Sequence, residues 1–292
     1  MKSNLISRRN LLKCLSFTPF AALCATTSGD EERRFPHLKG NIRQSVTYSH
    51  KGLRSMPVEE LAKQLLEMGV WGLDLVNPNE WDKVMKAGLI VTLSRAPAVR
   101  MEDGFNHVEY HDYLQEVYDD LIPKAAKAEI KQIICFSGNR REKSDDEGIQ
   151  NCITGLRRIM PTAEQHGVTL VMELLNSVGH KDYHADRTAF GAQIARGLKS
   201  ENFKLLYDVY HMQMSEGRLI DTIRKNKDVI GHYHTAGAPG RKDLDENQEI
   251  YYPAVMRAIV ETGFKGFVAH EFSPKKEDNL ESLREAVRVC DV

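Results

Sequence analysis

Short apolar runs alternate with amphipathic segments along the chain from residue 41 onward. Eight of these runs are mostly continuous and rich in Val, Ile and Leu, which is typical of parallel strands buried on both faces. They are residues 41–46, 70–76, 89–93, 132–136, 168–173, 203–208, 229–234 and 266–271. The segments between them carry apolar residues at helical spacing. The clearest of these segments are residues 58–68, 107–128, 148–166, 251–262 and 279–290.

Repeated strand–helix units predict a parallel sheet with right-handed crossovers. Eight such units over about 250 residues are what a single α/β domain, the (β/α)8 TIM barrel, requires. An open doubly wound sheet is the alternative, but no G-x-G-x-x-G motif follows the first predicted strand. Gly69, Gly167 and Gly263 end predicted helices just before the next strand, which indicates short turns. We therefore expect one barrel domain.

The first 28 residues differ in character from the rest of the chain. Basic residues, including Arg8 and Arg9, and no acidic residue accompany a mostly apolar run at 15–25. This is the layout of a secretory signal. The motif SRRNLLK at 7–13 also resembles the twin-arginine export signal. The apolar run is too short to cross about 30 Å of hydrocarbon, so we expect no permanent membrane span.

These features predict the domain boundaries and the location of the protein. We expect a twin-arginine-type signal peptide at 1–28, a solvated linker at 29–40 and the barrel at 41–292. The mature protein would then be periplasmic, and the twin-arginine route would deliver it already folded. Lipoprotein anchoring through Cys24 is a less favoured alternative, because Leu23 is bulkier than the residue that usually precedes a lipidated cysteine.

Composition limits the classes of partner and fold. The chain is 41% hydrophobic and 28% charged, with a formal net charge of −1, and these are ordinary globular values. No basic stripe is present, so we expect no nucleic-acid partner. The five cysteines are too few and too scattered for a disulfide scaffold or a zinc ribbon. The oligomeric state stays open, a homo-oligomer included.

Ionisable side chains close four consecutive predicted strands. Glu173, Asp208, His234 and Glu271 each end an apolar run, and chemistry in a barrel lies at the C-terminal ends of the strands. Burying three acids together is prohibitive without a compensating charge, which a divalent cation supplies. Three carboxylates and one imidazole suit Mn²⁺, Mg²⁺ or Co²⁺. The alternative is that each acid caps a helix or pairs with an arginine.

Four motifs resemble those of a known family. The stretches CFSGNR, VMELLNS, LLYDVYHMQ and HYHTAGAPGR resemble the hydroxypyruvate isomerase branch of the sugar isomerase/epimerase superfamily, the xylose isomerase-like TIM barrels. The resemblance implies that Glu173, Asp208, His234 and Glu271 hold a divalent metal. It also implies that Glu173 and Glu271 form the acid–base pair that moves a proton. His211 and Arg241, the latter in the PGR segment, match positions that contact substrate.

One departure from that branch leaves the substrate open. Members of the hydroxypyruvate isomerase branch often have Gln where this chain has His234, whereas ketose 3-epimerases have His. Export would also be unexpected for the central metabolism of hydroxypyruvate. Both observations favour a sugar or sugar acid outside the cytoplasm.

Five further residues are candidates for binding substrate. Asn139 and Arg140 follow the fourth predicted strand, and a tight Ser-Gly turn aims them at the barrel mouth. Asn176 and Lys181 lie in the long loop after Glu173, where such loops often shape specificity. Asp74 ends the second strand, where relatives often have an acid that orients a base or the substrate. His180 and His184 in the long loop fit a site or a surface equally well.

The sequence therefore predicts a divalent-metal-dependent aldose–ketose isomerase or ketose epimerase of a small sugar or sugar acid. The metal would act as a Lewis acid, and a glutamate would move the proton through a cis-enediolate. One alternative is an exported sugar-binding protein without turnover. The other is an endonuclease IV-like phosphodiesterase, which would need three zinc ions and more histidines at strand ends. The ends of the first four predicted strands do not meet this need, because only Asp74 among them offers a ligand.

Overall fold

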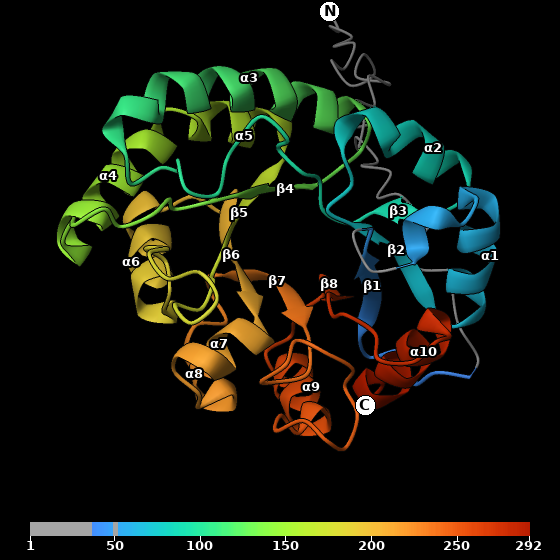
Figure 1. Ribbon diagram of the computed structural model, residues 1–292. Coiled ribbons are helices and arrows are strands. Elements are labelled where there is room, and N and C mark those ends of the chain that lie inside the picture. Colours follow the sequence, from blue (N-terminus) through green and yellow to red (C-terminus); the bar gives the residue numbers. More distant parts are fainter. Residues whose placement is uncertain (1–36, 49–51) are drawn as a thin grey trace, which may run out of the picture. The chain divides into compact units, whose positions relative to one another are not determined.

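Eight parallel strands alternate with helices along the described chain, which is residues 37–48 and 52–292 of the computed structural model (Figure 1). The strands are β1 Arg43–Thr47, β2 Val70–Asp74, β3 Ile90–Val91, β4 Gln132–Cys135, β5 Thr169–Glu173, β6 Phe203–Asp208, β7 Ile230–Thr235 and β8 Phe267–His270. Each overlaps an apolar run named above, so the eight predicted strands are confirmed. The predicted signal peptide and residues 29–36 of the predicted linker lie outside the described residues.

The helices lie around the outside of the strands (Figure 1). They are α1 Val58–Glu67, α2 Trp81–Lys86, α3 His111–Lys127, α4 Asp145–Arg157, α5 Met160–His166, α6 Thr188–Leu198, α7 Val209–Ser215, α8 Leu219–Lys225, α9 Tyr252–Glu261 and α10 Asn279–Cys290. Three single 3-10 turns, Leu53–Ser55, Pro78–Glu80 and Val108–Tyr110, precede α1, α2 and α3. No helix in this part of the chain is long and apolar enough to cross a membrane.

The prediction of one helix over 148–166 is wrong, because α4 and α5 are separate helices. Pro161 lies in the first turn of α5 and has no N–H to bond to the preceding turn. The chain tightens before it: the N–H groups of Arg158 and Ile159 bond to carbonyls three residues back. The apolar period continues across this break, so the pattern alone reads as one helix.

The sheet closes on itself. Its order is β3-β2-β1-β8-β7-β6-β5-β4, with every neighbouring pair parallel. Ser94, just after β3, joins the two ends: its N–H donates to the Gln132 carbonyl at 2.9 Å, and its own carbonyl accepts from Ile134 N–H at 3.0 Å. The fold is thus the predicted (β/α)8 barrel. In this closed order β3 and β7 lie opposite each other.

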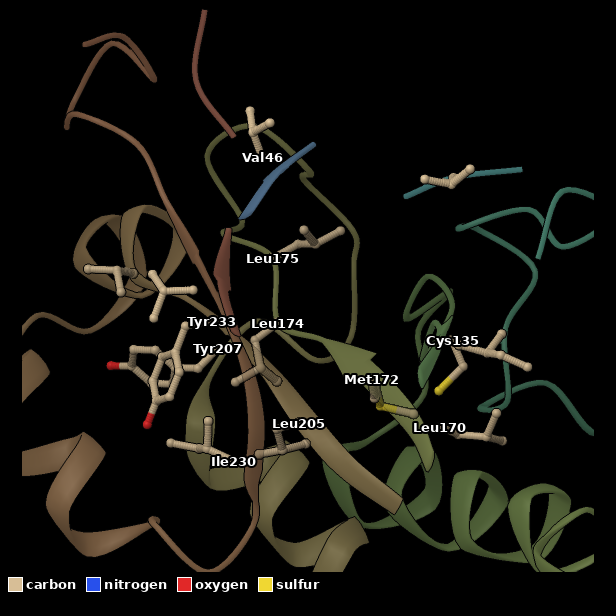
Figure 2. Close-up of a cluster of buried hydrophobic side chains, with 14 of the residues drawn as sticks. Val46, Cys135, Leu170, Met172, Leu174, Leu175, Leu205, Tyr207, Ile230 and Tyr233 are labelled. Carbon is tan, nitrogen blue, oxygen red and sulfur yellow. The ribbon is translucent and has the colours of Figure 1, made fainter. Parts of the chain in front are cut away.

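Side-chain alternation decides which residues reach the barrel interior. Val171 and Leu206 join a small apolar cluster of their own, separate from the layer between strands and helices. Their chain neighbours Met172 and Tyr207 belong to that outer layer (Figure 2). The same period places Glu173 and Asp208 on the inner face at the strand ends. The buried rings of Tyr207 and Tyr233 pack 6.0 Å apart in the outer layer, so β7 presents its even-numbered residues inward.

The two ends of the described chain are bonded to each other. The backbone N–H groups of Lys39 and Gly40 donate to the Asp291 carboxylate at 2.8 and 3.2 Å. Asn41 donates through its side chain to the Val292 carbonyl at 2.7 Å. These bonds fix residues 39–41 beside the end of α10, just before the chain enters β1.

Candidate active site

Four ionisable side chains meet at the C-terminal ends of β5 to β8. Glu173 and Asp208 end β5 and β6, His234 is the penultimate residue of β7, and Glu271 follows β8 directly. Each offers a ligand atom, and these atoms all lie within 4.8 Å of one another. Asp208 and His234 are completely buried, and Glu173 is 6% exposed. The structure therefore brings together the four residues named from the sequence, in a group that could hold a metal ion.

The two ring nitrogens of His234 face different partners. Nδ1 lies 3.0 Å from Glu271 Oε2 and 3.6 Å from Glu173 Oε1, while Nε2 lies 3.1 Å from Asp74 Oδ2. Burial alone lowers the pKa of His234, but the charge of Glu271 and hydrogen bonds to the three carboxylates raise it well above its ordinary value. The surrounding carboxylates thus favour a positive charge at Nδ1, whether a proton or a cation supplies it.

Asp74 lies behind His234 and is completely buried. Its Oδ1 accepts hydrogen bonds from Thr92 and from Ser45 Oγ at 2.9 Å, and its Oδ2 faces His234 and, at 2.6 Å, His232 Nε2. Burial tends to raise the pKa of Asp74, but the two imidazoles hold it far below its ordinary value. The ionised carboxylate fixes the Nε2–H tautomer of His234, which leaves Nδ1 free as a ligand atom.

His232 is a buried imidazole that the sequence analysis did not single out. Gln132 donates its amide to the Gly231 carbonyl at 2.9 Å, which turns its Oε1 toward His232 Nδ1 at 2.8 Å. Both nitrogens of His232 therefore face acceptors. Asp74, His232 and His234 form a second group close enough to hold a cation, but their contacts are those of hydrogen-bonded pairs. His232 could have been found from the sequence, because side chains alternate along a strand and His232 therefore lies on the same face of β7 as His234.

Asp208 and His211 are set by the start of α7. Asp208 caps this helix through Oδ1, which accepts the His211 N–H at 3.1 Å, while its Oδ2 is buried without a hydrogen-bond partner. The Nδ1 of His211 accepts the Asn176 N–H at 3.0 Å, so the proton of the neutral ring is on Nε2. That Nε2 also lacks a partner and lies 3.7 Å from Asp208 Oδ2. Two unpaired buried atoms thus face each other.

Burial and charge set the protonation of these two groups. Burial raises the pKa of Asp208, against the opposing charge of Arg241. Burial, aided by Arg241, lowers the pKa of His211 to about 3. His211 is therefore a neutral hydrogen-bond donor near pH 7. Asn176, predicted to bind substrate, instead holds the ring of His211 from behind.

Arg241 lies against the carboxylates. Its guanidinium is 2.8 Å from Glu271 Oε2 and 3.7 Å from Asp208 Oδ2. Burial opposes the charge of this guanidinium, but Glu271, Asp208 and Glu173 outweigh that effect and raise the pKa of Arg241. In turn His234 and Arg241 offset burial and lower the pKa of Glu271. Glu271 is ionised and accessible, as a base must be.

A cavity of about 360 Å³ opens beside these groups. Glu173, Glu271, Arg241 and His180 line its polar side. Its other side is mostly apolar and comes largely from the loop that follows β3, at residues 95–101. A concave, mostly apolar space with a few converging polar groups is the usual form of a small-molecule site.

Three other predicted residues do not line this cavity. The backbone carbonyl of Asn139 accepts hydrogen bonds from Asn106 and His107 at 2.7 and 2.8 Å. The guanidinium of Arg140 pairs with Asp145, and Lys181 is exposed on the loop surface. The turn after β4 therefore points Arg140 toward the start of α4 rather than into the mouth, because Asp145 in the first turn of that helix attracts it.

His180 is a cavity residue that the sequence left undecided. Its ring lies 5.4 Å from that of His211, and its N–H donates to the Asn176 carbonyl at 3.0 Å. Burial lowers the pKa of His180. His184, its neighbour in the loop, is completely buried against α4 and does not line the cavity. A loop of this length gives no periodicity from which their directions could be read.

The fold and the four-residue group agree with one family of TIM barrels. The xylose isomerase-like TIM barrel family matches residues 86–291, and the chain belongs to this family. Among curated relatives, hydroxypyruvate isomerase of Escherichia coli is 27% identical over 50% of this chain and 56% of its own length. 2-Oxo-tetronate isomerase of Cupriavidus necator is 29% identical over 39% of this chain and 43% of its own length. The matches thus span about half of each relative.

Solved structures share the fold at low identity. A family 2 AP endonuclease from Brucella melitensis superposes with a TM-score of 0.73 and 18% identity, covering 83% of this chain and 96% of the other. D-psicose 3-epimerase from Clostridium cellulolyticum H10 gives 0.66 and 16%, covering 86% and 96%. At such identities these likenesses establish the architecture and no more.

Proposed function

We propose that the protein is a divalent-metal-dependent isomerase or epimerase of a small sugar or sugar acid. The observation that carries this proposal is the placement of two carboxylates, Glu173 and Glu271, beside His234 Nδ1 and along one cavity. The names of the two curated relatives, hydroxypyruvate isomerase and 2-oxo-tetronate isomerase, support the same class.

The donor set fits a divalent cation. Three carboxylates and one imidazole nitrogen converge, and oxygen-rich sets of this kind suit Mn²⁺, Mg²⁺ or Co²⁺. Asp208 Oδ2 is buried and has no hydrogen-bond partner, which a ligand would satisfy. Bound by Glu173, Asp208, His234 and Glu271, such an ion would polarise a sugar carbonyl and its neighbouring hydroxyl as a Lewis acid.

The chain's own residues supply the rest of the chemistry. Glu173 or Glu271 removes the proton from the carbon next to the carbonyl. In an isomerisation the same glutamate returns a proton to the former carbonyl carbon, and the hydroxyl proton passes from one substrate oxygen to the other. In an epimerisation the second glutamate delivers a proton to the opposite face of the carbon that lost one. His211 donates its free Nε2–H to a substrate oxygen, and Arg241 holds Glu271 and offers its remaining N–H groups. If one glutamate carries the proton both ways the result is isomerisation, and if two act from opposite sides it is epimerisation.

A chromatographic screen of trioses to hexoses and of their acids, run on Mn²⁺-loaded protein, tests this proposal. We expect conversion between two isomers, loss of conversion after chelation, and recovery with Mn²⁺ or Co²⁺. Full activity after verified metal removal would contradict metal dependence. Binding without any product over long incubation would instead support a sugar-binding protein that has lost turnover.

A further inference from the structure

Arg95 is the cavity cation that lacks a partner. It lines the cavity together with Glu173 and Glu271, and it is exposed. Among the described residues, no hydrogen bond or ion pair joins the Arg95 guanidinium to another group. The Arg241 guanidinium, by contrast, donates a hydrogen bond to Glu271 Oε2 at 2.8 Å. An unpaired guanidinium on a cavity wall is available to a ligand.

The backbone holds Arg95 across the barrel mouth from His234. Arg95 follows Ser94, which closes the barrel between β3 and β4, and its N–H donates to the Val76 carbonyl at 3.0 Å. In the closed sheet, β3 lies four strands from β7 in either direction. A ligand held near His234 can therefore extend across the mouth toward Arg95.

The wall beside Arg95 restricts what such a ligand can be. Pro97, Val99 and Met101 of the same loop and Leu175 of the loop after β5 line the cavity. Their side chains offer no strong hydrogen-bonding group, so the hydroxyls of a long polyol would be left unpaired there. A short carbon chain that ends in one strongly polar group fits this wall better.

We infer that Arg95 binds a carboxylate on the substrate, and that the substrate class is short sugar acids rather than neutral sugars. The inference rests on the proposed function for the site as a whole. A guanidinium matches a carboxylate with two parallel hydrogen bonds. Phosphate sites usually add a helix N-terminus or a backbone nest. In the part of the chain that the structure describes, the other cavity cation is the already paired Arg241.

Isothermal titration with unreactive ligands tests Arg95 without requiring turnover. Glycerate and threonate carry the carboxylate, glycerol and threitol are their neutral counterparts, and Mn²⁺-loaded full-length protein is the receptor. We expect the acids to bind the wild type more tightly than the polyols, and Arg95→Gln to weaken acid binding by about 10–100-fold. Arg100→Gln is the matched control, because Arg100 lies on the same loop but pairs with Glu102 and Asp103 outside the cavity.

The outcomes separate this inference from the proposed function. Equal affinity for acids and polyols, or unchanged acid affinity in Arg95→Gln, would overturn the role of Arg95 whatever the turnover screen shows. If the protein bound inorganic phosphate more tightly than glycerate, and this binding depended on Arg95, the assignment of a carboxylate as the group bound by Arg95 would be wrong. Arg95-dependent binding of acids by a protein that converts no sugar would uphold this inference and refute the proposed activity.

Discussion

The two ring nitrogens of His234 show how single residues shape this site. Asp74 fixes the proton on Nε2, and Nδ1 is thereby aimed at Glu173 and Glu271. Carboxylates that hold a ligating histidine in this way raise its basicity and fix its orientation. Asp74 was a substrate-binding candidate on sequence alone; its contacts suit a positioning role behind the ligand.

Replacing Asp74 by Asn should weaken metal binding with all four ligands intact. The amide carries no charge and no longer dictates the His234 tautomer, so we expect Mn²⁺ affinity to fall about 10–100-fold. Titration of the metal-free protein with Mn²⁺, followed by electron paramagnetic resonance, measures this. Asp243→Asn is the matched control, because Asp243 is also buried but accepts a hydrogen bond from the Lys275 N–H rather than from an imidazole. Equal Mn²⁺ affinity in the wild type and in Asp74→Asn would show that Asp74 does not position His234 for metal binding.

Replacing Glu271 by Gln should nearly abolish turnover. The site loses a negative ligand and the accessible base beside the cavity, and removal of a general base usually costs about 10²–10⁴-fold in rate. Steady-state kinetics on the substrate found in the screen measures the loss. Glu277→Gln, an exposed change in the loop after Glu271, should leave kcat unaltered. A Glu271→Gln enzyme within about tenfold of wild type would refute the base assignment.

At the scale of elements, strand alternation and strand ends account for most of the site. In a barrel, the reacting groups lie at the C-terminal ends of the strands. This rule was enough to predict Glu173, Asp208, His234 and Glu271 from the sequence. Contacts across the barrel could not be predicted in this way: Asp74 and His232 meet although 158 positions separate them. The directions of loop residues such as Arg140 depend on which partner lies nearest, and an isolated loop sequence does not state this.

The loop between β5 and α6 should give the protein a local pH dependence through His184. Burial and the charge of Arg140 lower its pKa from 6.5 to about 4, and its Nδ1 accepts a hydrogen bond from Asn106 at 2.9 Å. A folded-state pKa below the unfolded one means that this stability is full above about pH 6.5 and is lost as the pH falls toward 4.

Urea unfolding at several pH values tests this dependence. His184→Asn keeps an acceptor near Nδ1 but cannot be protonated, so its unfolding free energy should fall less than that of the wild type between pH 6.5 and 4. His166→Asn, at the end of α5, serves as the control. Parallel curves for wild type and His184→Asn would contradict the assignment.

For the molecule as a whole, the apolar pattern was enough to predict the eight-unit barrel. It did not predict the break between α4 and α5, because Pro161 interrupts the helical backbone while the spacing of apolar residues continues. The N-terminal 36 residues lie outside the described part. We propose from the sequence that residues 1–28 of this segment direct export through the twin-arginine route to the periplasm.

Changing Arg8 and Arg9 together to Lys tests the export proposal. Lys keeps the charge but removes the planar fork that a receptor can bind with two hydrogen bonds. We expect the variant to stay in the cytoplasm, folded and uncleaved, as judged by cell fractionation and by mass spectrometry of the N-terminus. Unimpaired export would show that a charged segment and an apolar run suffice. A diacylglyceryl mass on Cys24 would establish lipoprotein anchoring instead.

The central claim is that Glu173 and Glu271 move a carbon-bound proton of a bound sugar or sugar acid. Incubation of the panel in D₂O with Mn²⁺-loaded protein, followed by proton NMR, tests it directly. We expect the proton next to the carbonyl of at least one compound to exchange for deuterium as its isomer forms. We also expect chelation or Glu271→Gln to stop both processes. Isomer formation or exchange that persists in a Glu173→Gln/Glu271→Gln double variant would contradict it.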